Sequence, residues 1–363
     1  MSACCAPCLG AEAHAVPAAV GSAFAASGKP WDTFPGDEAG HDQAPRQQRV
    51  GEGDMATATA TAAATAAAAA RAAESMALPT HTVETWTLNK GRDEGTGRKR
   101  INQYTKLKRL GEGSYGKVVL YQSDDSGERV AVKVLSRTKL RKAVVGGRTA
   151  LSDAMREVAI MKQLDCPQVL RLTEVIDDLR EEKLYLVLEF ADKGVAMDPV
   201  RVDNAIGEGE GARRIALDAC LGTEYLHNRG VVHGDIKPDN LLLFGGGHAK
   251  LADLGVSQAF EGADDRLVRS PGTPAFFAPE CCRGGGYSGR AADCWALGVT
   301  IFCLVFGRYP FLGRTESETY NVIQRAELML PAECSQELAD LLRGLMHPDP
   351  VQRLTATQAA SLA

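Results

Sequence analysis

A run of three glycines constrains the fold of this chain more than any other feature. In LGEGSYGKVV, Gly111, Gly113 and Gly116 follow the GxGxxG spacing. This spacing lets backbone amides approach phosphate oxygens, and in dinucleotide-binding proteins it joins a strand to a helix. Here KVVLY after Gly116 is β-branched and indicates a second strand instead. The pattern therefore predicts a β-hairpin that covers phosphates, with glycines that serve only a tight turn as the alternative.

The chain divides into two regions of different composition. The first includes the tract MATATATAAATAAAAARAAES, from Met55 to Ser75, whose methyl groups offer too little apolar area to offset chain entropy. We therefore predict that residues 1–95 form a low-complexity Ala/Thr-rich extension without a packed core, passive in turnover. Apolar periods and turn signals become regular from Tyr104, which predicts one domain over residues 104–363.

The order of elements in residues 104–363 predicts an α+β fold. The first part alternates strand-like runs with glycine turns, which indicates an antiparallel meander, and EKLYLVLEF adds a further strand. ARRIALDACLGTEYLHNRG is predicted to be a helix that ends near Gly230, and the remainder to Ala363 is predicted to be mostly helical. A strand-rich lobe is therefore expected to precede a larger helical lobe.

One helix is predicted between the two groups of strands, in LSDAMREVAIMKQL. Its expected N-cap is Ser152 or Asp153. Apolar residues recur there at every third position, at Met155, Val158, Met161 and Leu164.

Charge and hydropathy argue against two classes of partner. With 41 basic and 46 acidic residues the formal charge is −5, which supplies no basic field for direct nucleic-acid binding. The longest strongly apolar run, Trp295 to Phe306, is too short to span a bilayer, so no membrane segment is predicted.

The ten cysteines form no paired CxxC set and suit a reducing compartment, so a cytoplasmic or nuclear location is expected. An organelle transit peptide stays open as an alternative, because the first 30 residues carry one acidic residue, Glu12.

A lysine inside an apolar strand needs a counter-charge. Lys133 ends the run VAVK, seventeen residues after Gly116, and desolvating its ammonium is costly unless an acid pairs with it. Glu157, on the helix that follows, is the predicted partner. The pair would hold Lys133 on the α and β phosphates of ATP, and Ala131 is small enough to leave room for adenine. A solvated surface lysine is the alternative.

The stretch VVHGDIKPDN, residues 231–240, carries polar groups suited to phosphoryl transfer. Asp235 can accept the proton of a hydroxyl, Lys237 can neutralise the transferring phosphoryl, and Asn240 can hold Mg²⁺. Asp253, thirteen residues past Asn240 in the run DLG, is the second predicted metal ligand, and Mn²⁺ could replace Mg²⁺. Phosphoryl transfer needs cations near the developing charge and an aligned nucleophile, and these residues supply both.

Taken in order, these residues resemble the catalytic domain of eukaryotic protein kinases over Tyr104 to Ala363. An APE run at residues 278–280 follows them at that family's spacing, and Lys237 and Thr273 resemble the serine/threonine branch. The resemblance implies a bilobal α+β kinase fold, with a small antiparallel β-rich N-lobe at about 104–189 and a larger α-helical C-lobe at about 192–363. It also implies transfer of the γ-phosphate of Mg-ATP to a protein hydroxyl.

The same resemblance implies which residues surround ATP. Leu188 resembles the gatekeeper, and Glu189 to Ala191 resemble the hinge that hydrogen-bonds adenine. The implied nucleotide contacts are Leu110, Gly111, Glu112, Gly113, Ser114, Gly116, Val118, Ala131, Lys133, Leu188, Glu189, Ala191, Leu242 and Asp253. Asp293 resembles the buried aspartate that steadies the catalytic loop, and Glu280 with Arg353 resembles the ion pair of the helical lobe. Core packing is the alternative for these last positions.

Finer motifs narrow the resemblance. KRINQY, HGDIKPDN, RSPGTPAFFAPECC and GRYPFLG are similar to motifs of the plant geminivirus Rep-interacting kinases, which in turn resemble calmodulin-dependent protein kinase kinases. Both groups phosphorylate the activation-loop threonine of sucrose-nonfermenting-type and AMP-activated kinases. The implied partner is therefore another serine/threonine kinase, in energy sensing. A kinase for a different protein and an inactive pseudokinase scaffold are the alternatives.

Gly234 stands where many kinases place an arginine that grips a phosphate on the activation loop. Without that donor, activity is expected to depend less on such a clamp, with Ser270 or Thr273 as candidates for phosphorylation. The chain stops soon after Arg353, where relatives continue through a final helix, so the terminal packing is expected to be either incomplete or supplied otherwise. No basic amphipathic helix can follow, so direct control by calmodulin is not expected.

Overall fold

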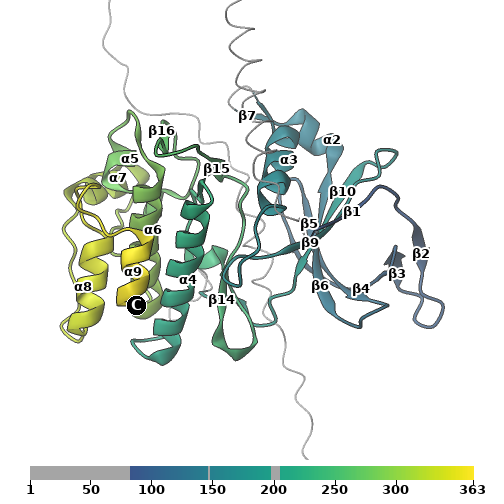
Figure 1. Cartoon of the computed structure of the whole chain (residues 1–363), viewed down its shortest axis with the longest axis horizontal. Coiled ribbons are helices and arrows are strands. Elements are labelled where there is room, and N and C mark those ends of the chain that lie inside the picture. Colours follow the sequence, from purple (N-terminus) through teal and green to yellow (C-terminus); the bar gives the residue numbers. More distant parts are fainter. Residues whose placement is uncertain (1–81, 146–147, 198–204) are drawn as a thin grey trace, which may run out of the picture.

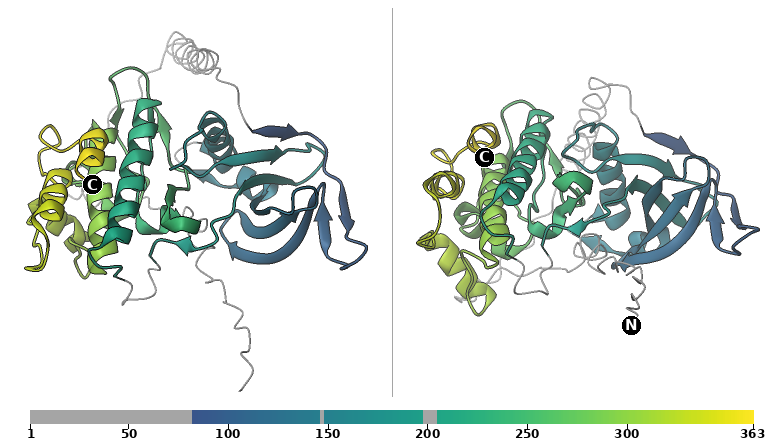
Figure 2. Two further views of the ribbon diagram at one scale, coloured as in Figure 1. Left: turned by 60° about the horizontal axis from the view of Figure 1, so that its bottom comes forward. Right: turned by 90° about the horizontal axis from the view of Figure 1, so that it is seen from below.

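The computed structural model describes residues 82–145, 148–197 and 205–363, which form a strand-rich lobe and a helical lobe (Figure 1). The two lobes remain side by side when the molecule is turned (Figure 2). This arrangement confirms the predicted bilobal α+β fold. The prediction of a low-complexity extension falls mostly on residues 1–81, which lie outside the described residues.

The first lobe is built on one curled sheet of eight strands, in the order β1-β9-β10-β6-β5-β4-β3-β2. Neighbouring strands are antiparallel except β1 and β9, which are parallel. A buried cluster of aliphatic and tyrosine side chains, among them Val132, Tyr185 and Val187, forms a core of its own within this lobe. The strands are β1 Val83–Thr85, β2 Lys90–Arg92, β3 Lys99–Ile101, β4 Tyr104–Glu112, β5 Gly116–Ser123, β6 Arg129–Ser136, β9 Leu172–Ile176 and β10 Lys183–Glu189.

The sheet begins earlier in the sequence than predicted. β1, β2 and β3 precede Tyr104, and β1 and β2 form the two outer strands of the sheet. The predicted boundary, with an unstructured extension up to residue 95, is therefore wrong for residues 82–95. Three-residue strands rich in charge carry no apolar alternation, and their backbone hydrogen bonds depend on partners distant in sequence.

Helix α3, Ala150–Met161, is the helix predicted between the strands, but its cap differs from the prediction. The N-cap is Thr149, whose hydroxyl accepts a hydrogen bond from the Ser152 amide at 3.3 Å, so Ser152 and Asp153 lie inside the first turn. Met155 is 39% exposed, because it faces away from the core that Val158 and Met161 enter. Before α3 lie the short helix α2, Arg137–Lys142, and the hairpin of β7, Val144–Val145, with β8, Arg148–Thr149.

The second lobe packs its helices around α6. Trp295 and Phe302 of α6 are among the largest fully buried side chains. Among the described helices only α6 is long and apolar enough to cross a membrane, yet 78% of its residues are buried, which is typical of a core helix. The helices are α4 Glu210–Asn228, α5 Pro279–Cys282, α6 Gly289–Phe306, α7 Glu316–Arg325, α8 Gln336–Leu345 and α9 Ala356–Leu362.

Packing at the end of the chain is supplied in part by the last described helix. Helix α9 begins with a capping box between Thr355 and Gln358, and its Ala356 and Ala359 are buried as it packs against α4 and α8. The sequence after Arg353 is rich in alanine, so the buried face of this helix is small. The apolar pattern therefore gave little indication of its packing.

Short strands in the second lobe place the loops between the lobes. β12, Val231–Val232, ends just before His233, and β13, Leu241–Leu243, follows Asn240 directly. β14, Ala249–Leu251, pairs with β13 and ends two residues before Asp253. The remaining strands are β11 Gly194–Val195, β15 Gln258–Ala259, β16 Arg266–Leu267 and β17 Tyr287–Ser288.

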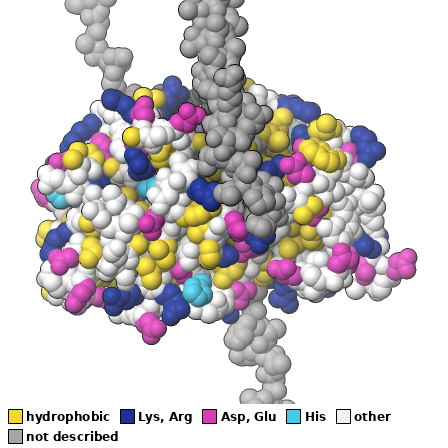
Figure 3. Space-filling model, viewed as in Figure 1, with side chains coloured by type: hydrophobic (Ala, Val, Ile, Leu, Met, Phe, Trp, Pro, Cys, Tyr) yellow, Lys and Arg dark blue, Asp and Glu magenta, His cyan; other side chains and the backbone are white. Residues whose placement is uncertain are grey.

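Charge is mixed on the surface. Basic and acidic side chains alternate with apolar ones over the face in Figure 3, and neither sign forms a continuous field there. This distribution agrees with the nearly balanced composition and gives no basic footprint for nucleic acid on this face.

Candidate active site

The three glycines lie in a β-hairpin, as predicted. β4 and β5 are joined through reciprocal backbone bonds, from the Gly113 amide to the Gly116 carbonyl at 2.8 Å and from the Gly116 amide to the Gly113 carbonyl at 3.4 Å. A Cβ atom on Gly116 would lie 2.1 Å from the Val134 carbonyl oxygen, so only glycine permits this approach of β5 to β6. Strand β5, not a helix, directly follows the glycines, which excludes the dinucleotide-binding arrangement. Glycine is thus required at position 116 by strand packing. That the tip of the hairpin covers the phosphates of a nucleotide stays a prediction.

Lys133 and Glu157 form the predicted pair. Lys133 Nζ lies 2.8 Å from Glu157 Oε1 and 3.9 Å from Asp253 Oδ1, and all three residues are buried. Burial lowers the pKa of Lys133, but the charges of Glu157 and Asp253 and the hydrogen bond to Glu157 outweigh it and raise the pKa above its ordinary value. Lys133 therefore keeps its positive charge where the phosphates of a nucleotide are expected.

Asp253 and Asn240 present oxygen atoms that suit a hard cation. The Oδ1 atoms of both residues are buried, and neither has a hydrogen-bond partner among the described residues. Burial raises the pKa of Asp253, with Lys133 opposing the shift and Glu157 and Asp235 adding to it. Asp253 also has a left-handed backbone, with φ +61°, a conformation that non-glycine residues adopt mostly at constrained sites. These two residues fit a Mg²⁺ ion, a hard cation that prefers oxygen ligands.

Asp235 is held by three side chains. Lys237 Nζ donates to Asp235 Oδ2 at 2.7 Å, and the Asn240 amide donates to the same oxygen at 3.2 Å. The amide and hydroxyl of Thr273 donate to Oδ1 at 2.9 and 2.8 Å. Lys237 also donates to the Thr273 hydroxyl at 2.8 Å, which closes a ring of charge-assisted bonds. The structure therefore brings together the predicted base, Lys237 and Asn240.

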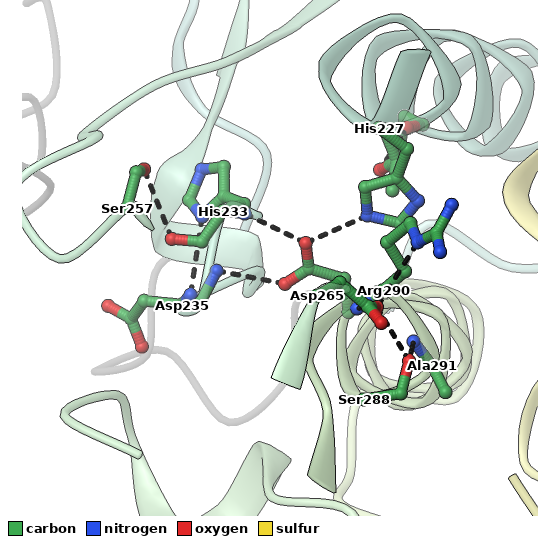
Figure 4. Close-up of polar contacts among 12 residues, drawn as sticks. His227, His233, Asp235, Ser257, Asp265, Ser288, Arg290 and Ala291 are labelled. Atoms are coloured by element: carbon green, nitrogen blue, oxygen red, sulfur yellow. Dashed lines mark hydrogen bonds and ion pairs between the residues drawn. The ribbon is translucent and has the colours of Figure 1, made fainter. Parts of the chain in front are cut away.

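Asp293 fixes the loop that carries Asp235. Its carboxylate accepts the backbone amides of His233 and Gly234, each at 2.8 Å, and lies 3.0 Å from His227 Nε2. The contacts of His227 and His233 are drawn in Figure 4. Gly234 has φ +80°, in the left-handed region that side chains disfavour. Glycine therefore relieves backbone strain at this position, a reason that sequence spacing could not reveal.

The residues implied to surround adenine lie on the expected strands. Leu188 on β10 and Leu120 on β5 are the cross-strand partners of Ala131 on β6, and Val118 on β5 is the partner of Lys133. The implied gatekeeper Leu188 and the residues implied to line adenine, Val118, Ala131 and Leu242, are each at most 3% exposed. Their contact with adenine stays a prediction, because buried aliphatic residues also serve the core.

Sequence reasoning missed two contacts of the site. The Thr273 bonds to Asp235 join residues 38 apart, and Thr273 was singled out only by resemblance. Lys250 on β14 forms an ion pair with the carboxylate of Glu189 at the end of β10. Its place three residues before Asp253 was the only signal available. The other predicted ion pair, between Arg353 and Glu280, is present at 2.6 and 3.0 Å.

Comparisons with known proteins agree with this geometry. A family model described as the protein kinase domain matches residues 104–362. The serine/threonine-protein kinase GRIK1 of Arabidopsis thaliana is 46% identical over 278 residues, which cover 76% of this chain and 70% of that protein. GRIK2 of the same plant is 47% identical over 275 residues, which cover 75% and 67%. The calcium/calmodulin-dependent protein kinase kinase of Caenorhabditis elegans is 37% identical over 276 residues, which cover 70% and 51%. The resemblance predicted from the motifs is thereby confirmed, and the chain belongs to the protein kinase family, as a serine/threonine protein kinase.

Proposed function

We propose that this kinase phosphorylates the activation-loop threonine of another protein kinase, of the sucrose-nonfermenting or AMP-activated type. The observation that carries the proposal is the similarity, at 37% identity, to a protein whose name states that its substrate is a protein kinase. The motifs that resemble the Rep-interacting kinases, and the higher identity to GRIK1, support the same substrate class.

The contacts of Asp235 suit it as the base for a hydroxyl substrate. Its carboxylate receives the proton as the oxygen attacks, while Lys237, 2.7 Å away, offsets negative charge on the transferring group. Lys133, fixed by Glu157, aligns the phosphates behind the reacting phosphorus. Most of the catalytic effect would come from this positioning and from positive charge, since phosphoryl transfer needs little covalent chemistry from the protein.

Asn240 and Asp253 would hold Mg²⁺. Their Oδ1 atoms are buried and have no hydrogen-bond partner among the described residues, so a cation would satisfy both. Held by these two residues, the ion would supply positive charge that offsets the negative charge developing on the phosphates.

The pseudokinase alternative is less well supported. A scaffold has no need of the Lys133–Glu157 pair, of two buried oxygens without hydrogen bonds or of an oriented Asp235, and the described residues have all of them. A different protein substrate remains the second candidate. Val195, just past the hinge, offers no acid to bind an upstream arginine of a substrate, which argues against a strongly basophilic kinase.

The test is transfer of labelled phosphate from Mg-ATP to a catalytically inactive AMP-activated-type kinase. The controls are the same substrate with its activation-loop threonine replaced by alanine, and Asp235→Asn enzyme. We expect label only on the threonine-bearing substrate, and none from the Asp235→Asn enzyme. Label on a generic substrate alone would leave a kinase with another target, and ATP binding without any transfer would favour the scaffold.

A further inference from the structure

Residues 82–103, which we name the N-terminal strap, precede the match of the family model and yet belong to the sheet. β1 runs parallel to β9 in the register Val83–Glu174, Glu84–Val175 and Thr85–Ile176. The hairpin of β2 and β3 then pairs with β4 at the opposite end of the sheet. The strap thus covers both ends of the sheet that carries Lys133.

Buried polar contacts anchor the strap. Glu174 of β9 is only 4% exposed, and its carboxylate accepts hydrogen bonds from Thr85, from Gln103 at 2.9 Å and from the Tyr104 hydroxyl at 2.6 Å. Burial raises the pKa of Tyr104, so that hydroxyl stays protonated and donates. Two of these donors belong to the strap, and a buried carboxylate that lost them would be left poorly compensated.

A second anchor is apolar. Leu88 is 8% exposed and joins the core cluster of the first lobe, while its amide donates to Asp178 Oδ2 at 3.1 Å. Loops that merely lie on a surface do not bury a leucine in a core and satisfy two buried carboxylates. The strap is therefore docked in one specific position.

The strap also contacts the helix that carries Glu157. Glu84 Oε1 lies 2.6 Å from Nζ of Lys162, the C-cap residue of α3, and the Thr82 hydroxyl donates to the Leu172 carbonyl at 2.8 Å. β1 therefore ties the end of α3 to the edge of β9. Glu157 lies on the last turns of the same helix, five residues before Lys162.

We propose that the strap positions α3 for catalysis, with Glu84 acting through Lys162 to keep Glu157 paired with Lys133. Glu84 is a positioning residue, since it touches neither the nucleotide site nor the reacting groups. A strap that leaves its place would free the end of α3 and weaken the hold of Glu157 on Lys133. The strap, which lies before the region that the family model matches, thus affects the KM for ATP. This effect does not depend on which protein the kinase phosphorylates.

The test uses the full chain with Glu84→Lys, Lys162→Glu and the double variant, assayed with a generic serine/threonine peptide. Each single variant should raise KM for ATP about two- to fivefold, because an exposed ion pair has only a modest effect. The double variant should restore KM, because it rebuilds the pair in reverse. A merely structural role would lower kcat through a smaller active fraction and leave KM unchanged.

The matched control is Glu181→Lys, which breaks the exposed ion pair between Lys90 of the strap and Glu181, away from α3. KM for ATP should match wild type in this variant. An unchanged KM in Glu84→Lys, a double variant no better than the single ones, or an equal rise in Glu181→Lys would each overturn the proposal.

Hydrogen exchange provides a second readout that does not depend on activity. Leu88→Asp should undock the strap and speed amide exchange in α3 while α6 stays protected, whereas Val83→Asp, at a 58% exposed position of β1, should change neither. If Leu88→Asp loses protection throughout the chain, exchange in α3 of the Glu84→Lys variant decides instead. Protection of α3 equal to wild type there would contradict the proposal.

Discussion

Thr273 donates two hydrogen bonds to Asp235 Oδ1, one from its backbone amide and one from its hydroxyl. Its hydroxyl both donates to Asp235 and accepts from Lys237, so a phosphate on this residue would place negative charge against a carboxylate. Thr273 therefore serves the loop as a hydroxyl, which leaves Ser270 as the better candidate of the two for phosphorylation.

We predict that Thr273→Val lowers kcat about tenfold or more, since a hydrogen bond to a charged group contributes roughly 1.5–3 kcal/mol. Thr273→Ser should retain most activity, because it keeps the hydroxyl. Steady-state kinetics on a generic peptide measures both. Equal activity of the valine and serine variants would show that the hydroxyl has no part in the loop.

Asp253 should make the nucleotide-free protein less stable at neutral pH. Burial raises its pKa, so the fold favours the protonated carboxyl, and the charged form destabilises the protein at pH values above the ordinary pKa of aspartate. Asp253→Asn should therefore raise the melting temperature at neutral pH while it abolishes phosphate transfer. Lys133 keeps Glu157 as a counter-charge in this variant.

The sign of this effect can be checked against pH. As the pH falls through the raised pKa, wild type gains the proton and recovers stability, so the difference between the variants should shrink. Melting curves from neutral to mildly acidic pH, without nucleotide, follow this difference. A variant less stable than wild type at neutral pH would mean that the pairing of Asp253 with Lys133 outweighs its burial.

At the scale of elements, α3 depends on a cap that the sequence did not identify. Thr149→Ala should lower the free energy of unfolding by about 1 kcal/mol, the usual loss when a side-chain N-cap is removed. Ser152→Ala should have a smaller effect, since this residue lies in the first turn and its exposed hydroxyl bonds only the Thr149 carbonyl. Urea denaturation of both variants decides between the two caps, and a larger loss in Ser152→Ala would favour the cap predicted from sequence.

Much of the site could be predicted because its chemistry depends on residue type and order. Lys133, Glu157, Asp235, Asn240 and Asp253 stand at fixed places along the chain, and the turn and strand signals around them are local. Contacts such as Thr273 with Asp235 could not be predicted without the resemblance, because they depend on how distant segments meet. The same holds for β1, whose three residues gain their strand conformation only from pairing with β9. The left-handed backbone of Gly234 was likewise hidden, since glycine is compatible with many conformations.

At the scale of the whole molecule, Arg353, near the end of the chain, contacts Glu280 of α5 and Ala291 of α6. Its guanidinium binds Glu280 and the Ala291 carbonyl, and it lies 5.1 Å from the centre of the Trp295 ring. The Arg353 side chain is fully buried in the assembled lobe. Segments before, within and after α6 therefore meet at one charged group.

We predict that Arg353→Leu lowers the free energy of unfolding by about 3 kcal/mol, because it leaves the partly buried charge of Glu280 without its partner. Adding Glu280→Gln to this variant should recover part of the loss, since the uncompensated charge is then removed. Chemical denaturation of the single and double variants measures the coupling. A double variant as unstable as the sum of the two single ones would show that the pair acts independently.

The sheet order has a practical consequence for any shorter version of this protein. If the chain were cut at Tyr104, β9 would lose its partner strand along Glu174–Ile176, and β4 would lose its partner at Tyr104 and Thr105. Unpaired strand edges recruit other strands and promote aggregation, whereas the outer strands β1 and β2 are three residues long and carry charges such as Glu84, Lys90 and Arg92. A fragment that begins at residue 82 should accordingly stay dispersed at concentrations where one that begins at residue 104 precipitates.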